Sequence, residues 1–95
     1  MIIVDQLNIN DKPLLGVKVE LPQAPLLLIK YDEVIIGCGY FSIETMENLG
    51  QVACTVSGVN NFDEVINSEI KEFTPQASQR GAKKGMVVRE FIDSL

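Results

Sequence analysis

The 95-residue sequence contains no histidine and no tryptophan, and the first absence narrows its possible chemistry. Histidine is the commonest general base in enzymes and the usual partner of a nucleophilic serine or cysteine, so catalytic pairs of that kind are excluded. Most zinc sites also use histidine, and we predict no metal and no other cofactor. The composition does not decide whether the protein is an enzyme, but it favours a non-enzymatic role.

Basic residues are scarce, with 8 Lys and Arg against 13 Asp and Glu, for a net charge of −5. Nucleic acids and anionic membranes select basic surfaces, so we expect neither as a partner. The longest apolar run, residues 25–29, is far shorter than the roughly 20 residues of a membrane-spanning helix. Only two cysteines are present, and no basic segment precedes the first apolar residues. We therefore expect a cytoplasmic protein with reduced thiols.

Aliphatic side chains dominate what is present. The sequence is 46% hydrophobic but has only two Tyr and four Phe. Its length fits one domain over residues 1–95. So much aliphatic surface on a short chain predicts that another subunit covers part of it. The expected partner is a second copy of the same chain.

The first part of the chain has the pattern of a β-hairpin. Apolar residues alternate with polar or small ones over residues 15–21, and a turn signal lies at residues 10–13. Residues 1–21 are therefore predicted to pair with each other. Pro22 and Pro25 cannot donate to a strand ladder, so this hairpin region should stand partly apart from the rest.

The body, residues 22–95, alternates short strands with short helices. The helices follow the N-cap residues Ser42, Asn61 and Thr74 or an amphipathic pattern near the C-terminus. The predicted strands are 26–29, 34–37 and 51–57, the predicted helices are 42–49, 62–67, 74–81 and 87–95, and 70–73 is either an edge strand or a link. The fold class is therefore α+β, with an N-terminal β-hairpin region and a mostly antiparallel sheet packed with short helices.

The segment Gly37-Cys38-Gly39 is the most interesting chemically. A cysteine at a strand end, between glycines and before a helix, is placed where backbone N–H groups can stabilise a thiolate. The glycines would let a ligand approach the backbone. The alternative is a small buried cysteine in a tight bend, which is the commoner role of a free thiol. Cys38 is the candidate catalytic residue, whereas Cys54 lies on the apolar face of a strand and is predicted to be core.

Two further segments complete the candidate ligand site. Ser57-Gly58 ends a predicted strand but lacks the flanking pattern of a nucleophile elbow. Lys83 and Lys84 precede a predicted helix, where a phosphate or carboxylate could bind, although a solvated loop explains them equally well. The candidate ligand-binding residues are Gly37, Cys38, Gly39, Ser57, Gly58, Lys83 and Lys84.

The order of three short motifs resembles the YunC-like family of bacterial and archaeal domains of unknown function. These motifs are Cys38-Gly39-Tyr40, Ser57-Gly58-Val59 and the segment from Gly81 to Met86. The resemblance covers nearly the whole chain. It implies a small α+β domain whose N-terminal β region, here residues 1–21, mediates assembly into a tetramer. It implies no particular activity.

Three hypotheses follow for function. The favoured one is a homo-oligomeric module that binds a small ligand or a protein partner. The second is a small enzyme or thiol sensor that uses Cys38. The third is a purely structural subunit of a larger assembly.

Overall fold

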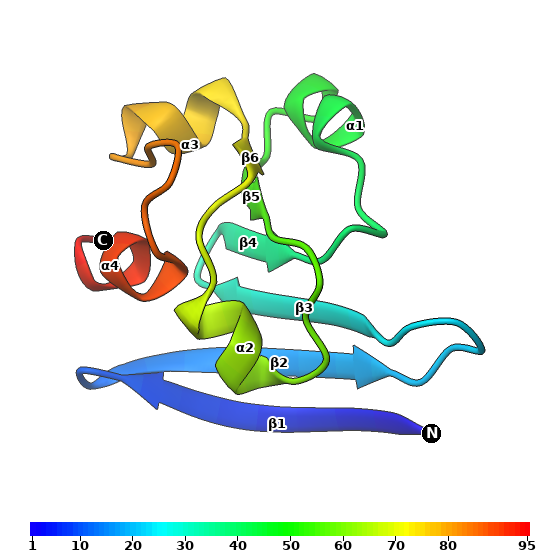
Figure 1. Cartoon of the computed structure of the whole chain (residues 1–95). Helices are drawn as coiled ribbons and strands as arrows, with labels where there is room; N and C mark the ends of the chain where they lie inside the picture. The colour runs from blue at the N-terminus through cyan, green and yellow to red at the C-terminus, as the bar shows by residue number, and fades with distance from the viewer.

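A computed structural model describes all residues, 1–95, and shows one six-stranded sheet with the strand order β1-β2-β3-β4-β5-β6 (Figure 1). Four of its five strand pairs are antiparallel, and only β4 and β5 run parallel. The strands are β1 (Ile2–Ile9), β2 (Lys12–Val19), β3 (Leu26–Tyr31), β4 (Val34–Gly37), β5 (Val52–Thr55) and β6 (Glu72–Phe73). The helices are α1 (Ile43–Asn48), α2 (Phe62–Asn67), α3 (Pro75–Gln79) and α4 (Val88–Asp93). The predicted α+β class is confirmed.

Each predicted N-cap forms its hydrogen bond. The side-chain oxygen of Ser42 accepts from the Thr45 N–H at 3.2 Å, and that of Asn61 accepts from the Glu64 N–H at 2.8 Å. These bonds satisfy backbone donors that a helix start leaves free, which explains why such short helices begin where they do. None of the four helices combines the length and the apolar character that crossing a membrane requires.

The β1–β2 hairpin closes through a two-residue turn. Asn10 and Asp11 have φ angles of 48° and 67°, a left-handed conformation that these residue types tolerate. β2 begins at Lys12, earlier than the predicted residue 15. Pro13 lies within this strand opposite Asn8. β3 pairs with β2 only from Leu15 onward, so the missing N–H of the proline costs no ladder bond to β3.

The prediction that the hairpin stands partly apart is wrong. β2 pairs with β3 in a register from Leu15 opposite Lys30 to Val19 opposite Leu26. Pro22 and Pro25 lie in the connection between the two strands, where no ladder bond is needed. The hairpin also contributes to the main core, because Leu14 is only 1% exposed.

The two faces of the sheet differ in what covers them. One face carries buried side chains that include Leu27, Ile29 and Ile36. It packs in one cluster with Val65 of α2 and Phe91 of α4. Figure 1 shows α2 lying over β2 and β3 on this side. The core is therefore a sheet face closed by short helices.

The opposite face of β1, β2 and β3 carries apolar side chains that no helix of the chain covers completely. Ile2 is 67% exposed and Val4 is 63% exposed. The register aligns these side chains in rows across the three strands, since Val4 lies opposite Val17 and Val17 lies opposite Leu28. We call this surface the open face; its apolar residues are Ile2, Val4, Leu15, Val17, Val19, Leu26 and Leu28.

Thr74 attaches α3 to the sheet through a buried hydroxyl. The side-chain oxygen accepts from the backbone N–H groups of Ala53 and Ala77, both at 3.2 Å. It donates to the Gln51 carbonyl oxygen at 2.8 Å. The residue is fully buried, so one hydroxyl both caps α3 and satisfies the backbone of β5.

Replacing Thr74 with valine should lower the free energy of unfolding by about 1–3 kcal/mol. The substitution keeps the shape but leaves two buried N–H donors without an acceptor. Urea denaturation measures the loss. The Thr74→Ser variant keeps the hydroxyl and should retain more stability, and equal midpoints for the two variants would contradict this account.

Candidate functional site

The parallel pairing of β4 and β5 decides where the candidate site forms. Ile36 lies opposite Cys54 and Gly37 lies opposite Thr55. The Val56 N–H extends the contact by donating to the Gly37 carbonyl oxygen at 2.9 Å. Because parallel strands end at the same edge of a sheet, the loops that follow them lie side by side.

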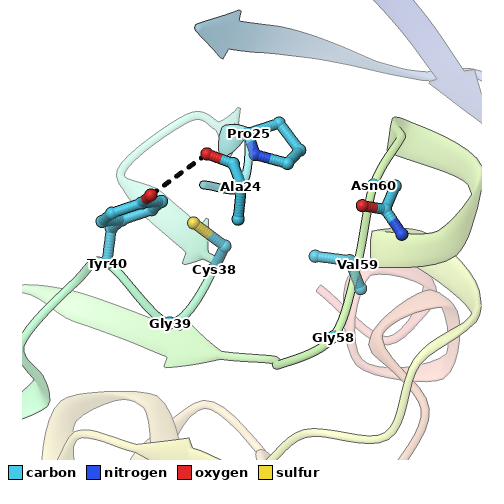
Figure 2. Close-up of a pocket in the computed structure, with 8 residues that line it drawn as sticks. All are labelled: Ala24, Pro25, Cys38, Gly39, Tyr40, Gly58, Val59 and Asn60. Carbon is cyan, nitrogen blue, oxygen red and sulfur yellow. Dashed lines mark hydrogen bonds between the residues drawn. The ribbon is translucent and has the colours of Figure 1, made fainter. Parts of the chain in front are cut away.

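A cavity of about 340 Å³ opens between these loops and the β2–β3 connection (Figure 2). Its volume falls at the small end of the range for ligand sites. Its walls come from three segments far apart in the sequence. The lining residues are Ala24 and Pro25 from the β2–β3 connection, Cys38, Gly39 and Tyr40 after β4, and Gly58, Val59 and Asn60 after β5.

Cys38 lines the cavity but is only 4% exposed. Its backbone N–H donates to the Leu27 carbonyl oxygen at 3.1 Å, and the Leu27 N–H donates to its sulfur at 3.3 Å. β3 therefore fixes both the backbone and the side chain of Cys38. Figure 2 shows the sulfur directed toward Ala24, on the far wall of the cavity.

The cavity lining offers backbone donors and no charged side chain. The N–H groups of Gly39, Tyr40, Gly58 and Val59 donate to no backbone oxygen of the chain. Gly58 has φ +70°, a left-handed conformation that favours glycine and turns the chain out of β5 toward α2. The two loops can thus present N–H groups to an acceptor from opposite walls of one small space.

Gly37 has a packing role and does not line the cavity. A Cβ atom at Gly37 would lie 2.5 Å from Cδ2 of Phe41, whereas a Cβ atom at Gly39 would meet nothing within 4 Å. The ring of Phe41 therefore covers the backbone of β4 at this point. The candidate Gly37 is explained by this close approach, and Gly39 is the glycine that faces open space.

The other candidates lie outside the cavity. Ser57 is exposed and does not line it. Lys83 and Lys84 are exposed in the α3–α4 connection, where the Lys83 carbonyl oxygen accepts from the Met86 N–H at 3.1 Å. The structure does not bring these lysines to Cys38, and a solvated loop accounts for them.

Cys54 belongs to the same buried core cluster as Cys38 but does not line the cavity. It is fully buried within the core cluster, as predicted. Burial raises the pKa of its thiol to about 12, because the low-dielectric interior disfavours the thiolate. Cys54 is therefore an inert packing residue at neutral pH.

Sequence reasoning missed five lining residues: Ala24, Pro25, Tyr40, Val59 and Asn60. The two tripeptides Cys38-Gly39-Tyr40 and Ser57-Gly58-Val59, singled out as a family resemblance, contain two of them. Nothing in the local sequence indicated that residues 24–25 reach the same place, since that depends on how β2, β3 and β4 pair.

The fold and the cavity define a small α+β domain with an uncharged site at the ends of its parallel strands. A family model described as "Domain of unknown function (DUF1805)" matches residues 37–95, so the chain belongs to this family. The matched region includes both loops of the cavity but not residues 24–25.

Two relatives extend the likeness to the whole chain. The "Uncharacterized protein YunC" of Bacillus subtilis (strain 168) is 28% identical over 96 residues, covering 97% of this chain and 95% of that protein. A crystal structure of a protein of unknown function, TA1206 from Thermoplasma acidophilum, is 34% identical with a TM-score of 0.95. It covers 100% of this chain and 93% of its own. The resemblance to the YunC-like family is confirmed.

Substituting each glycine beside Cys38 with alanine should distinguish the glycine that packs against Phe41 from the glycine that faces open space. Gly37→Ala forces the Phe41 ring to move and should destabilise the fold by about 1–3 kcal/mol, the usual cost of overpacking. Gly39→Ala has free space and should stay within about 0.5 kcal/mol of the wild type, as exposed substitutions do. Chemical denaturation of both variants tests this, and equal losses would refute the assigned role of Gly37.

Proposed function

We propose that this protein is a homo-oligomeric binding module whose cavity beside Cys38 holds a small uncharged molecule. The observation that carries the proposal is the convergence of the 38–40 and 58–60 loops on one cavity. Both loops contain a glycine and are at least eighteen positions apart in the sequence, yet they line the same cavity.

The chemistry of the lining supports an uncharged ligand with a hydrogen-bond acceptor. No Lys, Arg, Asp or Glu side chain lines the cavity, so a charged ligand would lose its hydration without gaining a counter-charge. Backbone N–H groups of Gly39 and Gly58 have no backbone acceptor, and a carbonyl oxygen fits such donors. The side chains of Pro25 and Val59 supply apolar contact.

Thiol chemistry at Cys38 is the second candidate function, and one contact favours it. The Leu27 N–H donates to the sulfur at 3.3 Å, as an N–H that stabilises a thiolate would. The chain has no histidine, and no carboxylate or amine lines the cavity to act as a general base. Reversible binding therefore takes precedence over turnover.

The open face supports the assembly half of the proposal. In a lone chain its rows of aliphatic side chains would stay in contact with water. A stable dimer covers roughly 800 Å² on each partner, which is a modest part of the 5445 Å² accessible surface of this chain. The occupant we propose is a second copy. A two-fold contact brings the same patch against itself. Its apolar residues from Ile2 to Leu28 are uncharged, and Lys30, opposite Leu15, is the charged residue that the register places on the same face.

The YunC-like resemblance points to the same N-terminal β region and to a tetramer, which would need a second, different contact besides the open-face pair. Deleting residues 1–21 is a poor test of this proposal. The deletion would remove Ile9 and Leu14 from the core, so the fold would fail together with any interface. Surface substitutions are the sharper probe.

Propionamide, a small uncharged carbonyl compound, should raise the melting temperature at tens of millimolar, while propionate should not. A ligand at ten times its dissociation constant adds about 1.4 kcal/mol, which shifts a domain of this size by several degrees. Asn60→Asp places a charge at the cavity wall and should abolish the shift. Ser57→Asp, in the same loop but outside the cavity, should keep it. Equal responses to propionamide and propionate would rule out the ligand class.

Val4→Lys should convert the oligomer to a 10.5 kDa monomer, because a lysine ammonium on the open face cannot be buried without a partner. Sedimentation equilibrium measures the mass. Asp5→Asn changes the net charge by the same amount on the opposite face of β1 and should leave the mass unaltered. A wild-type protein that sediments as a monomer throughout the micromolar range would disprove the assembly.

A further inference from the structure

The β2–β3 connection forms one wall of the cavity, which we call the roof. Residues 21–25 connect β2 to β3, and Ala24 and Pro25 from this connection line the cavity that Cys38 also lines. Cys38 is 4% exposed, although the loops on either side of it leave space. In Figure 2 the sulfur of Cys38 points at Ala24, with Pro25 beside it. The connection therefore lies on the side of the cavity toward which the thiol points.

Very little holds this connection in place. Its residues make no backbone–backbone hydrogen bond, and Pro22 and Pro25 have no N–H to offer one. Leu21 through Ala24 are exposed, and Pro25 is half-buried. A segment with few buried contacts and few backbone bonds is the kind that opens locally while the rest of a protein stays folded.

One side-chain hydrogen bond closes the roof. The Tyr40 hydroxyl donates to the Ala24 carbonyl oxygen at 3.1 Å, as the dashed line in Figure 2 shows. Tyr40 comes from the loop after β4, so this bond ties the roof to the opposite wall of the cavity. Tyr40 is itself 49% exposed. Burial of the ring therefore does little to explain its position, and the hydroxyl bond is its specific contact.

We propose that residues 21–25 form a lid over the cavity, and that the Tyr40 hydroxyl is the latch that keeps this lid closed. The lid controls when the uncharged ligand reaches the cavity and when a reagent reaches Cys38. The inference rests on the proposed binding function, since it assigns the regulation of that same site. Tyr40 is a positioning residue here, because it acts through the lid backbone.

The test measures access to both cysteines in the same molecule with iodoacetamide, followed by peptide mass spectrometry. Tyr40→Phe removes the latch and keeps the ring. Loss of one neutral hydrogen bond should raise the labelling rate of Cys38 about two- to tenfold. The labelling rate of Cys54, which only global unfolding exposes, should not change. Tyr31→Phe, on β3 and outside the cavity, should behave as the wild type.

Two outcomes would overturn the lid. An unchanged Cys38 rate in Tyr40→Phe would show that the bond holds nothing closed. A parallel rise at Cys38 and Cys54 would show that the variant loosens the whole fold. The result is independent of the ligand: faster Cys38 labelling with no propionamide response supports the lid and removes the ligand class. A propionamide response with unchanged Cys38 labelling supports the ligand class and overturns the lid.

Discussion

The parallel pairing of β4 with β5 is the constraint on which the rest of the site depends. Every other strand pair of this sheet is antiparallel, so the loops that follow the two strands of such a pair lie at opposite ends of the strands. Here the chain crosses over through α1 and returns in the same direction. The loops after Gly37 and after Thr55 therefore leave from one edge. Cys38 and Gly58 become neighbours for this reason, and the cavity between them follows.

The same arrangement explains why Cys38 and Cys54 have such different surroundings. Cys54 lies inside β5, where the sheet and its helices bury it and raise the pKa of its thiol to about 12. Cys38 follows the last residue of β4, and its N–H still bonds to Leu27 of β3. Both thiols are buried in the core cluster, but only Cys38 also borders the cavity. Cys54 can therefore serve as an internal control when the access of a reagent to Cys38 is measured.

Much of the fold could be predicted from the sequence, and the reasons for the failures are physical. The N-caps Ser42, Asn61 and Thr74 act locally, so their residue types are sufficient to place three helix starts. Pro22 and Pro25 were interpreted as separating the hairpin, but a proline stops pairing only within a strand, and these two lie between strands. Whether β2 meets β3 depends on burying Leu14 and Leu27 together, which no local pattern shows.

The site could be predicted only in part. Cys38, Gly39 and Gly58 were identified by residue type, because a thiol and flexible backbone are useful wherever they lie. Lys83 and Lys84 were chosen by the same reasoning and lie elsewhere, since residue type does not specify which loops meet. Ala24 and Tyr40 carry no chemical signal of their own. Their roles come from the sheet, which brings the β2–β3 connection within hydrogen-bond distance of the loop after β4.

The central claim is that the two loops after the parallel strands form one binding site under the β2–β3 connection. Amide chemical-shift mapping of the ¹⁵N-labelled protein during a propionamide titration tests it most directly. The account predicts saturable shifts with one common dissociation constant at Gly39, Tyr40, Gly58 and Val59, accompanied by Ala24. Shifts that are confined to one loop, scattered over the open face, or linear without saturation would contradict it.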